Sequence, residues 1–249
     1  KFMNKKPILI VAGEPNSVFL EIFFKTIKMK IKSPLILIAS HKLLLMQMKK
    51  LKFKKKIKIL DIKKIKNYSL NNKVINLINV SYKQNKPFEK ISKKSNNYIN
   101  ESFLYALKLI RQGFTNKLIN GPISKKNFLK KKKLGITEYI SDKFFIKNYA
   151  MLIYNKNLSV CPVTTHVPLK LVSKKINKKI IIEKIKLIDN FYKQKLKLKP
   201  RIAVLGINPH CETVSSFDED KKIISPAINF LKKKNYKVFG PLSSDTIFL

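Results

Sequence analysis

Short apolar runs alternate with amphipathic stretches along almost the whole chain. Continuous apolar runs are typical of strands covered on both faces, and apolar residues at every third or fourth position are typical of helices. Strands are predicted at residues 7–12, 35–39, 57–60, 74–78, 117–120, 201–206 and 238–242, with two paired strands at 150–154 and 158–161. Helices are predicted at about 16–29, 42–51, 98–113, 124–133, 176–196 and 221–234. This alternation indicates an α/β architecture with a mostly parallel sheet.

The composition is that of a folded globular protein without a membrane span. Hydrophobic residues make up 45% of the 249 positions, and no apolar run reaches the roughly 18 residues that indicate a spanning helix. The N-terminal residues run directly into the first strand and contain no signal-peptide pattern. The two cysteines, Cys161 and Cys211, are too few for a disulfide framework and are interpreted as small buried residues. We therefore expect a cytoplasmic protein.

The charge is strongly positive but does not by itself indicate a nucleic-acid partner. Lys and Arg total 54 against 14 acidic residues, a formal charge of +40, yet only Arg111 and Arg201 are arginines. Arginine is the preferred residue for bidentate contacts with bases and phosphates. The lysines are spread over the whole chain among many Ile and Asn residues, which is typical of a protein from an AT-rich genome. We expect no nucleic-acid partner and keep a lysine-driven nucleic-acid binder as the least favoured alternative. The charge would steer small anionic substrates toward the protein.

Two of the three histidines follow predicted strands. His210 comes shortly after the strand at 201–206, and His166 follows the strand at 158–161. Open α/β sheets bind ligands at the carboxyl ends of their strands, and neutral imidazole is a common ligand of zinc and related ions. The pattern suggests one metal site built from distant segments, which Asp245, beyond the last strand, could join. Spacing alone leaves open that these are only hydrogen-bonded loop residues, because no HExxH or paired CxxC pattern is present.

Two glycine turns, 13–15 and 121–124, each follow a strand and open a predicted helix. Backbone N–H groups at such positions can hold an anion. Neither turn is a GxGxxG or P-loop pattern. Ordinary strand-to-helix turns explain them equally well.

Seven short segments occur in an order and spacing that are far more specific than any one of them. They are 11–15 with Glu21, 120–125, 135–139, 164–169, 205–210, 224–227 and 240–248. Together they resemble the 4-hydroxythreonine-4-phosphate dehydrogenase family of vitamin B6 (pyridoxal 5'-phosphate) biosynthesis. The segments run collinearly from near residue 8 to the end of the chain, which apparently lacks the family's C-terminal part.

The resemblance implies the two-lobed α/β/α fold of the isocitrate and isopropylmalate dehydrogenases. This is not a Rossmann fold, which explains the missing GxGxxG pattern. On this basis we expect a first lobe of about residues 1–120 plus 238–249 and a second lobe of about 121–237. The resemblance also implies a homodimer whose active sites form at the subunit interface.

The same resemblance implies a reaction and its cofactors. An NAD- or NADP-dependent dehydrogenase would oxidise 4-phosphooxy-L-threonine to 2-amino-3-oxo-4-phosphobutanoate, which decarboxylates to 3-amino-2-oxopropyl phosphate. His166 and His210 would be two of three histidines that bind a divalent metal such as zinc, magnesium or cobalt. Asp245 matches an acidic residue near that metal and would handle protons or support the ligands. Thr137 matches the threonine that binds the substrate phosphate.

Three departures from the family pattern bear on this function. The substrate-binding histidine that precedes the threonine is Ile136 here, which removes one phosphate donor unless neighbouring lysines compensate. The first turn after Gly13 also differs, and the family's third metal histidine would lie beyond Leu249. We therefore keep two alternatives. One is a dehydrogenase of another phosphorylated hydroxy acid, threonate or erythronate 4-phosphate; the other is a truncated, inactive remnant that keeps the fold.

Overall fold

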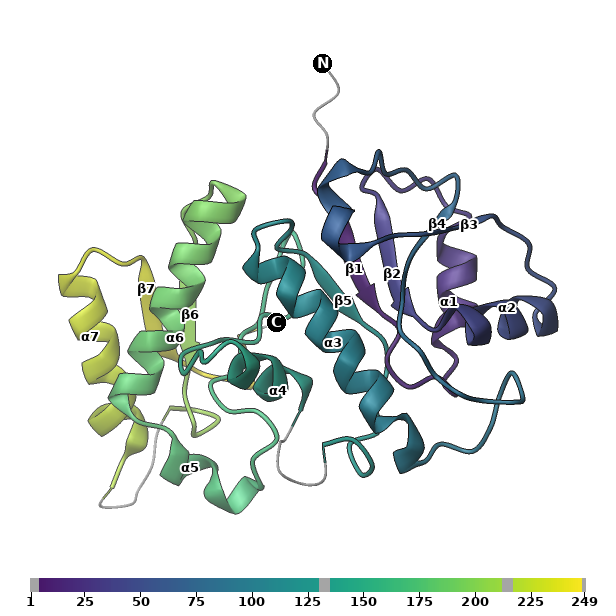
Figure 1. Ribbon diagram of the computed structural model, residues 1–249. Helices are drawn as coiled ribbons and strands as arrows, with labels where there is room; N and C mark the ends of the chain where they lie inside the picture. The colour runs from purple at the N-terminus through teal and green to yellow at the C-terminus, as the bar shows by residue number, and fades with distance from the viewer. Residues whose placement is uncertain (1–4, 130–134, 212–216, 248–249) are drawn as a thin grey trace. The chain divides into compact units, whose positions relative to one another are not determined.

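Contacts along the chain group it into two units, residues 1–134 and 135–249 (Figure 1). The computed structural model describes residues 5–129, 135–211 and 217–247. Within these ranges, no helix has both the length and the apolar character needed to cross a bilayer.

The first unit is built on a sheet of five parallel strands in the order β3-β4-β2-β1-β5. The strands are β1 (Ile8–Val11), β2 (Leu35–Ala39), β3 (Ile57–Ile59), β4 (Ile75–Asn79) and β5 (Leu118–Asn120). β2 lies at the centre, and all five of its residues are buried, as its continuous apolar run predicts. The order differs from the 3-2-1-4-5-6 order of a Rossmann domain, in agreement with the expected fold type.

Helices cover both faces of this sheet. α1 (Phe19–Thr26) and α2 (His41–Lys50) pack on one face, where Phe23 and its neighbours share a core with alternate residues of β1 and β2. Successive strand residues point to opposite faces, so Ile36 and the other intervening residues face away from that core. They are buried as well, and α3 (Asn96–Arg111) contacts β1 and β2. α3 therefore covers the second face.

Buried polar side chains fasten the long loop between β4 and α3 to the turn after β1. Gln47 on α2 is fully buried, and its Nε2 donates to the carbonyls of Pro15 at 2.9 Å and Pro87 at 2.7 Å. Glu14 is buried in the same turn, and its Oε2 accepts a hydrogen bond from the Ser95 hydroxyl at 2.9 Å. Because buried polar groups are costly when unpaired, these contacts hold the loop in place.

The two glycine turns pack against each other. Glu14 N donates to the Pro122 carbonyl at 2.8 Å, and Gly121 N donates to the Val11 carbonyl at 2.7 Å. Gly13 has a φ of +74°, and a Cβ there would lie 2.3 Å from the Pro122 oxygen. These N–H groups are used within the protein, which favours the ordinary-turn interpretation over an anion site.

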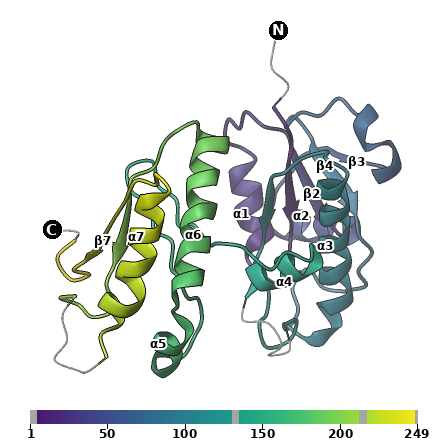
Figure 2. The same cartoon turned by 90° about the vertical axis from the view of Figure 1, so that its left-hand side faces the viewer.

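The second unit contains a two-stranded parallel sheet with two helices packed beside it. β6 (Ile202–Leu205) pairs with β7 (Val238–Leu242). α6 (Lys178–Phe191) and α7 (Ser225–Lys233) lie side by side, as both views show (Figures 1 and 2). The core that they share with the strands consists of Ile181, Ile185, Ile224, Ala227, Ile228, Leu231 and Val238.

The remaining elements of the described chain are short. They are α4 (Ile136–Lys143), α5 (Val172–Lys175), the short 3-10 helices Ile62–Asn67, Lys93–Ser95 and Leu169–Leu171, and the π-helical turns Tyr192–Leu196 and Asp220–Ile224.

Three predicted elements, two strands and a helix, are not formed as expected. The predicted strands at 150–154 and 158–161 meet only at one antiparallel bridge, Ile153–Val160. An isolated two-stranded hairpin is marginally stable, which explains why no longer ladder forms here. Of the helix predicted at 124–133, residues 125–128 form turns, and 130–133 lie outside the described residues.

The division into units differs from the expected lobes. β7 pairs with β6, and Val238 is buried in the core of the second unit, so residues 238–249 group with that unit. Residues 121–129 group with the first unit instead, because Gly121 and Pro122 bond to the turn after β1.

Candidate active site

The second unit contains all five residues that the sequence predicts for the site. Ile136 and Thr137 begin α4, and His166 lies in the loop before α5. His210 follows β6, and Asp245 follows β7. Because all five lie in one unit, whether they form one site depends on how the loops of this unit are arranged.

His210 and Asp245 are brought together by the pairing of β6 with β7. The loops after these strands meet at Pro209, whose carbonyl accepts hydrogen bonds from Ser244 N at 2.9 Å and the Ser243 hydroxyl at 2.8 Å. Next to this contact, His210 Nδ1 lies 3.0 Å from Asp245 Oδ2. The two side chains meet beyond the carboxyl ends of the strands, where open α/β sheets bind ligands.

The contact with Asp245 determines which nitrogen of His210 is free. The Ser243 hydroxyl, 2.6 Å from Asp245 Oδ1, lowers the pKa of Asp245 most strongly, and desolvation opposes it; the positive charge of a protonated His210 would lower it further. An ionised carboxylate only accepts hydrogen bonds, so Nδ1 must carry the hydrogen. In the neutral imidazole, Nε2 then keeps its lone pair, and the His210 side chain is 76% exposed. This is the imidazole state that binds divalent metals, with a carboxylate orienting the ligand.

A buried carboxylate holds the backbone just before His210. Asp220 is fully buried and accepts hydrogen bonds from Ile207 N at 2.8 Å, Asn208 N at 3.3 Å and Asn208 Nδ2 at 2.9 Å. Gly206 lies close to this cluster: a Cβ there would be 2.6 Å from Cys211 Sγ and 3.2 Å from Asp220 Oδ1. Nothing in the local sequence marks Asp220, since two of its three donors are backbone groups of a distant segment.

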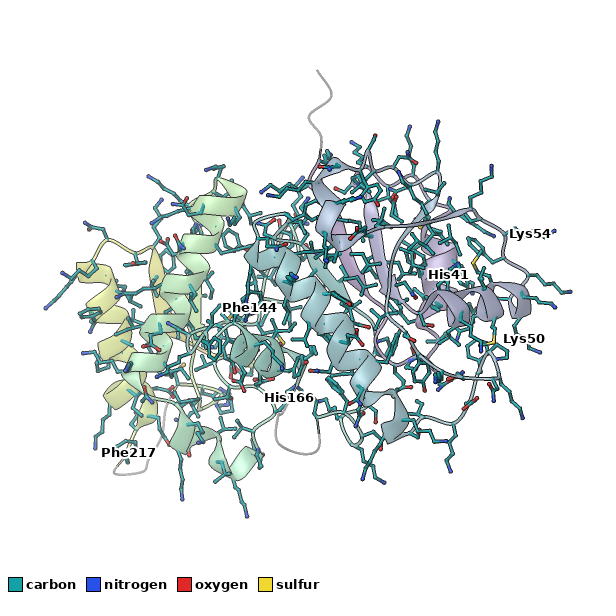
Figure 3. All side chains as sticks on the ribbon, in the orientation of Figure 1. His41, Lys50, Lys54, Phe144, His166 and Phe217 are labelled. Carbon is teal, nitrogen blue, oxygen red and sulfur yellow. The ribbon has the colours of Figure 1, made fainter. Side chains whose placement is uncertain are left out.

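His166 has an unusual backbone and a carboxylate nearby. Its φ of +56° lies in the left-handed region, which non-glycine residues adopt mainly in turns and at functional sites. The imidazole lies beside the start of α4 (Figure 3). A Cβ at Gly135 would be 3.5 Å from His166 Nε2 and 3.0 Å from Glu138 Oε2. Glu138 Oε1 accepts from the Thr165 hydroxyl at 3.4 Å, while Oε2 is buried without a hydrogen bond within the described chain. Glu138 is a second carboxylate that the sequence pattern missed.

Ile136 and Thr137 form the first turn of α4, after Gly135, which provides no side-chain cap. A helix N-terminus carries a partial positive charge and favours anions such as phosphate. The Ile136 side chain has no polar atom, so of these two side chains only that of Thr137 can add a hydrogen bond. Glu138, in the same turn, opposes an anion.

Comparison with known proteins connects this arrangement to a family. The family described as "Pyridoxal phosphate biosynthetic protein PdxA" matches residues 30–249. The chain belongs to this family. A 4-hydroxythreonine-4-phosphate dehydrogenase from Sulfurihydrogenibium sp. (strain YO3AOP1) is 34% identical over 249 residues, which cover 97% of this chain and 75% of that relative. A D-threonate 4-phosphate dehydrogenase from Pectobacterium atrosepticum is 36% identical over 116 residues, which cover 46% of this chain and 36% of that protein.

A solved structure has the same fold. The structure of 4-hydroxythreonine-4-phosphate dehydrogenase from Klebsiella pneumoniae matches with a TM-score of 0.85 and 24% identity, covering 98% of this chain and 75% of its own. The predicted α/β fold with a parallel sheet is thereby confirmed. The chain spans about three quarters of the length of these relatives.

The donor chemistry in this PdxA-family chain fits a divalent cation at His210, through the exposed Nε2. Within residues 5–129, 135–211 and 217–247, no group of three or more His, Cys, Asp or Glu side chains is placed to hold an ion. Both cysteines are free, and burial raises the pKa of Cys161 and of Cys211. Both side chains are only half-buried, so the prediction that they are buried residues is not met.

Proposed function

We propose that this chain is an NAD-dependent 4-hydroxythreonine-4-phosphate dehydrogenase of vitamin B6 biosynthesis. It oxidises 4-phosphooxy-L-threonine to 2-amino-3-oxo-4-phosphobutanoate, which decarboxylates to 3-amino-2-oxopropyl phosphate. The observation that carries the proposal is the 34% identity, over 97% of the chain, to a relative named for this activity. The contact between His210 and Asp245 supports it, because it leaves Nε2 ready for a cation.

In this proposal, His166 and His210 would hold a divalent cation, zinc, magnesium or cobalt. When bound, the cation would supply Lewis-acid polarisation of the hydroxyl that is oxidised, and NAD or NADP would supply the hydride acceptor. Asp245 keeps the hydrogen on His210 Nδ1 and so directs the lone pair of Nε2 outward. Asp245 is also our candidate for handling the proton of the substrate hydroxyl, since its carboxylate lies beside His210, a proposed cation ligand.

The substrate phosphate is assigned to the first turn of α4. Thr137 donates its hydroxyl, and the helix N-terminus adds a favourable field. Ile136 stands where a second donor is expected, so this part of the site holds the phosphate by fewer hydrogen bonds. The overall charge of +40 supports recruitment of a phosphorylated hydroxy-amino acid by long-range attraction.

We infer that the protein functions as a homodimer in the cytoplasm. Support for the dimer comes from the bridged segment at 151–160, in which Met151, Ile153, Leu158 and Val160 expose their apolar side chains. Exposed apolar patches of this kind mark interaction surfaces. Support for the cytoplasm comes from the two cysteines, which are free thiols. We expect neither a nucleic-acid nor a membrane partner.

A D-threonate 4-phosphate dehydrogenase is the second candidate. Ile136 favours it, because a changed phosphate site is compatible with a changed substrate, and a relative of that name is 36% identical over 46% of the chain. The test offers the full chain NAD with either 4-phosphooxy-L-threonine or D-threonate 4-phosphate and follows NADH absorbance. Turnover of the amino acid supports the first assignment, and turnover of the sugar acid alone overturns it in favour of the second. No turnover of either, together with no cobalt binding, identifies an inactive remnant.

A further inference from the structure

Asp220 is fully buried, and its carboxylate bonds to the segment just before His210. Its side chain meets the donors of two consecutive residues, Ile207 N, Asn208 N and Asn208 Nδ2. These residues directly precede Pro209 and His210 in the chain. A buried carboxylate without such donors would be strongly unfavourable, so these bonds fix the segment and the acid together.

We propose that Asp220 is the positioning residue of His210. The loop that carries His210 is fixed on both sides of it. Before His210, Asp220 accepts a hydrogen bond from the Asn208 side chain, and the Pro209 carbonyl accepts hydrogen bonds from the loop after β7. After it, Cys211 N donates to the Asn208 carbonyl at 2.9 Å. With its backbone fixed in this way, the imidazole of His210 reaches Asp245 with Nδ1 and presents Nε2 to solvent.

A carboxylate is required at position 220 because every partner is a donor. Its two oxygens accept all three hydrogen bonds, whereas Asn at this position has only one oxygen. In an Asp220→Asn variant, the side-chain NH2 would face the N–H groups of Asn208, which are donors as well. We expect the Asn208 segment to move away, and the His210–Asp245 hydrogen bond to be lost with it.

The test reads the tautomer of His210 by long-range 1H–15N imidazole spectra of the full chain at about pH 8, where an exposed imidazole is neutral. The chain has three histidines, and a His210→Gln variant assigns the signals of this one. We expect the Nδ1–H form in the wild type and a shift toward the Nε2–H form in Asp220→Asn. Asp189→Asn is the matched control: this buried acid lies on α6 in the same unit and pairs with Lys193, far along the chain from residues 207–210 and 220. Its His210 signals should stay as in the wild type.

Two results would overturn the proposal. One is an Asp220→Asn protein that melts earlier but keeps the wild-type His210 signals; the other is an equal shift in Asp189→Asn. If Asp220→Asn fails to fold, Asn208→Ala is the variant to use, because it removes only the hydrogen bond from Asn208 Nδ2 to Asp220. A shift of the His210 tautomer in the same direction supports the proposal, and an unchanged tautomer overturns it. As a second readout, Co2+ titration should show affinity lowered by about 10-fold in Asp220→Asn. The Co2+ measurement rests on the proposed function, whereas the tautomer measurement does not. Failure of the proposed function can therefore be distinguished from failure of this inference.

Discussion

His210 Nδ1 and Asp245 Oδ2 lie 3.0 Å apart, although they follow different strands. The parallel pairing of β6 with β7 places both loops at the same edge of the sheet, and Ser243 holds the carboxylate ionised beside the imidazole. One sheet contact therefore decides both the position and the protonation pattern of a candidate metal ligand.

Replacing Asp245 by Asn should weaken metal binding. The amide group can face Nδ1 with either its oxygen or its NH2, so the tautomer with a free Nε2 is no longer enforced. We expect affinity for Co2+ to fall by about 10- to 100-fold, measured by titration calorimetry. His41→Gln is the control, since His41 begins α2 in the other unit. Unchanged affinity in Asp245→Asn, or an equal loss in His41→Gln, would contradict the assignment.

Restoring a donor at position 136 should tighten substrate binding. Ile136→His adds a hydrogen bond to a charged phosphate, worth about 1.5 kcal/mol, or about 10-fold in KM. Thr137→Ala should raise KM by a similar factor, because it removes a donor from the same turn. Steady-state kinetics with NADH detection measures both. The control is Ile140→His, one turn further along α4; if it lowers KM as much as Ile136→His does, charge alone explains the effect.

Continuous apolar runs predicted the fold well. β2 and α3 were expected within two residues of their observed bounds, because each buries a strongly patterned face in the core. The strand predicted at 158–161 does not form, because its apolar residues Leu158 and Val160 are exposed rather than packed in a core. Its pairing is limited to one bridge, between Val160 and Ile153. α4 was missed because it has eight residues and starts at a glycine without a side-chain cap.

Only those residues of the candidate site that belong to family motifs could be predicted from the sequence. His210 and Asp245 could be named from the family pattern, and the structure places them in contact. Asp220 and Glu138 could not, because their environment depends on groups that folding brings near: backbone donors at 207 and 208 for Asp220, and Thr165 for Glu138. Short polar residues of this kind have no periodicity, so only coordinates identify their partners.

The exposed apolar residues of the bridged segment should control dimerisation. Lysine at Ile153 or Leu158, which are 60% and 57% exposed, would bury a charge in the proposed interface. We expect the dissociation constant of the dimer to rise at least 10-fold, as measured by light scattering across a dilution series. The control is Ile59→Lys in the first unit, an apolar residue of similar exposure, 52%. A wild-type protein that is monomeric throughout would contradict the dimer itself.

The stability that Asp218 contributes should disappear in acid. Hydrogen bonds from Lys221 N and Asp220 N, with the Lys221 ammonium nearby, lower the pKa of Asp218. A lowered folded-state pKa stabilises the protein fully above the unfolded pKa, near 3.9, and less as pH falls through the folded value. The melting temperature of Asp218→Asn should therefore lie below that of the wild type near neutral pH, with the difference shrinking as the pH falls below the unfolded pKa and vanishing below the lowered folded-state pKa. A difference that is constant with pH would show that packing, not charge, is responsible.

The close packing of the two glycine turns should make Gly13 far less tolerant than Gly113. Both have left-handed backbones, with φ of +74° and +70°. A Cβ at Gly113 meets nothing within 4 Å, so Gly113→Ala isolates the backbone cost, about 1 to 2 kcal/mol. A Cβ at Gly13 would lie 2.3 Å from the Pro122 oxygen, which belongs to rigid backbone. We expect Gly13→Ala to reduce the free energy of unfolding by about 3 kcal/mol or more, as measured by urea denaturation. Equal losses in the two variants would mean that the turns after β1 and β5 are not packed as closely as the structure places them.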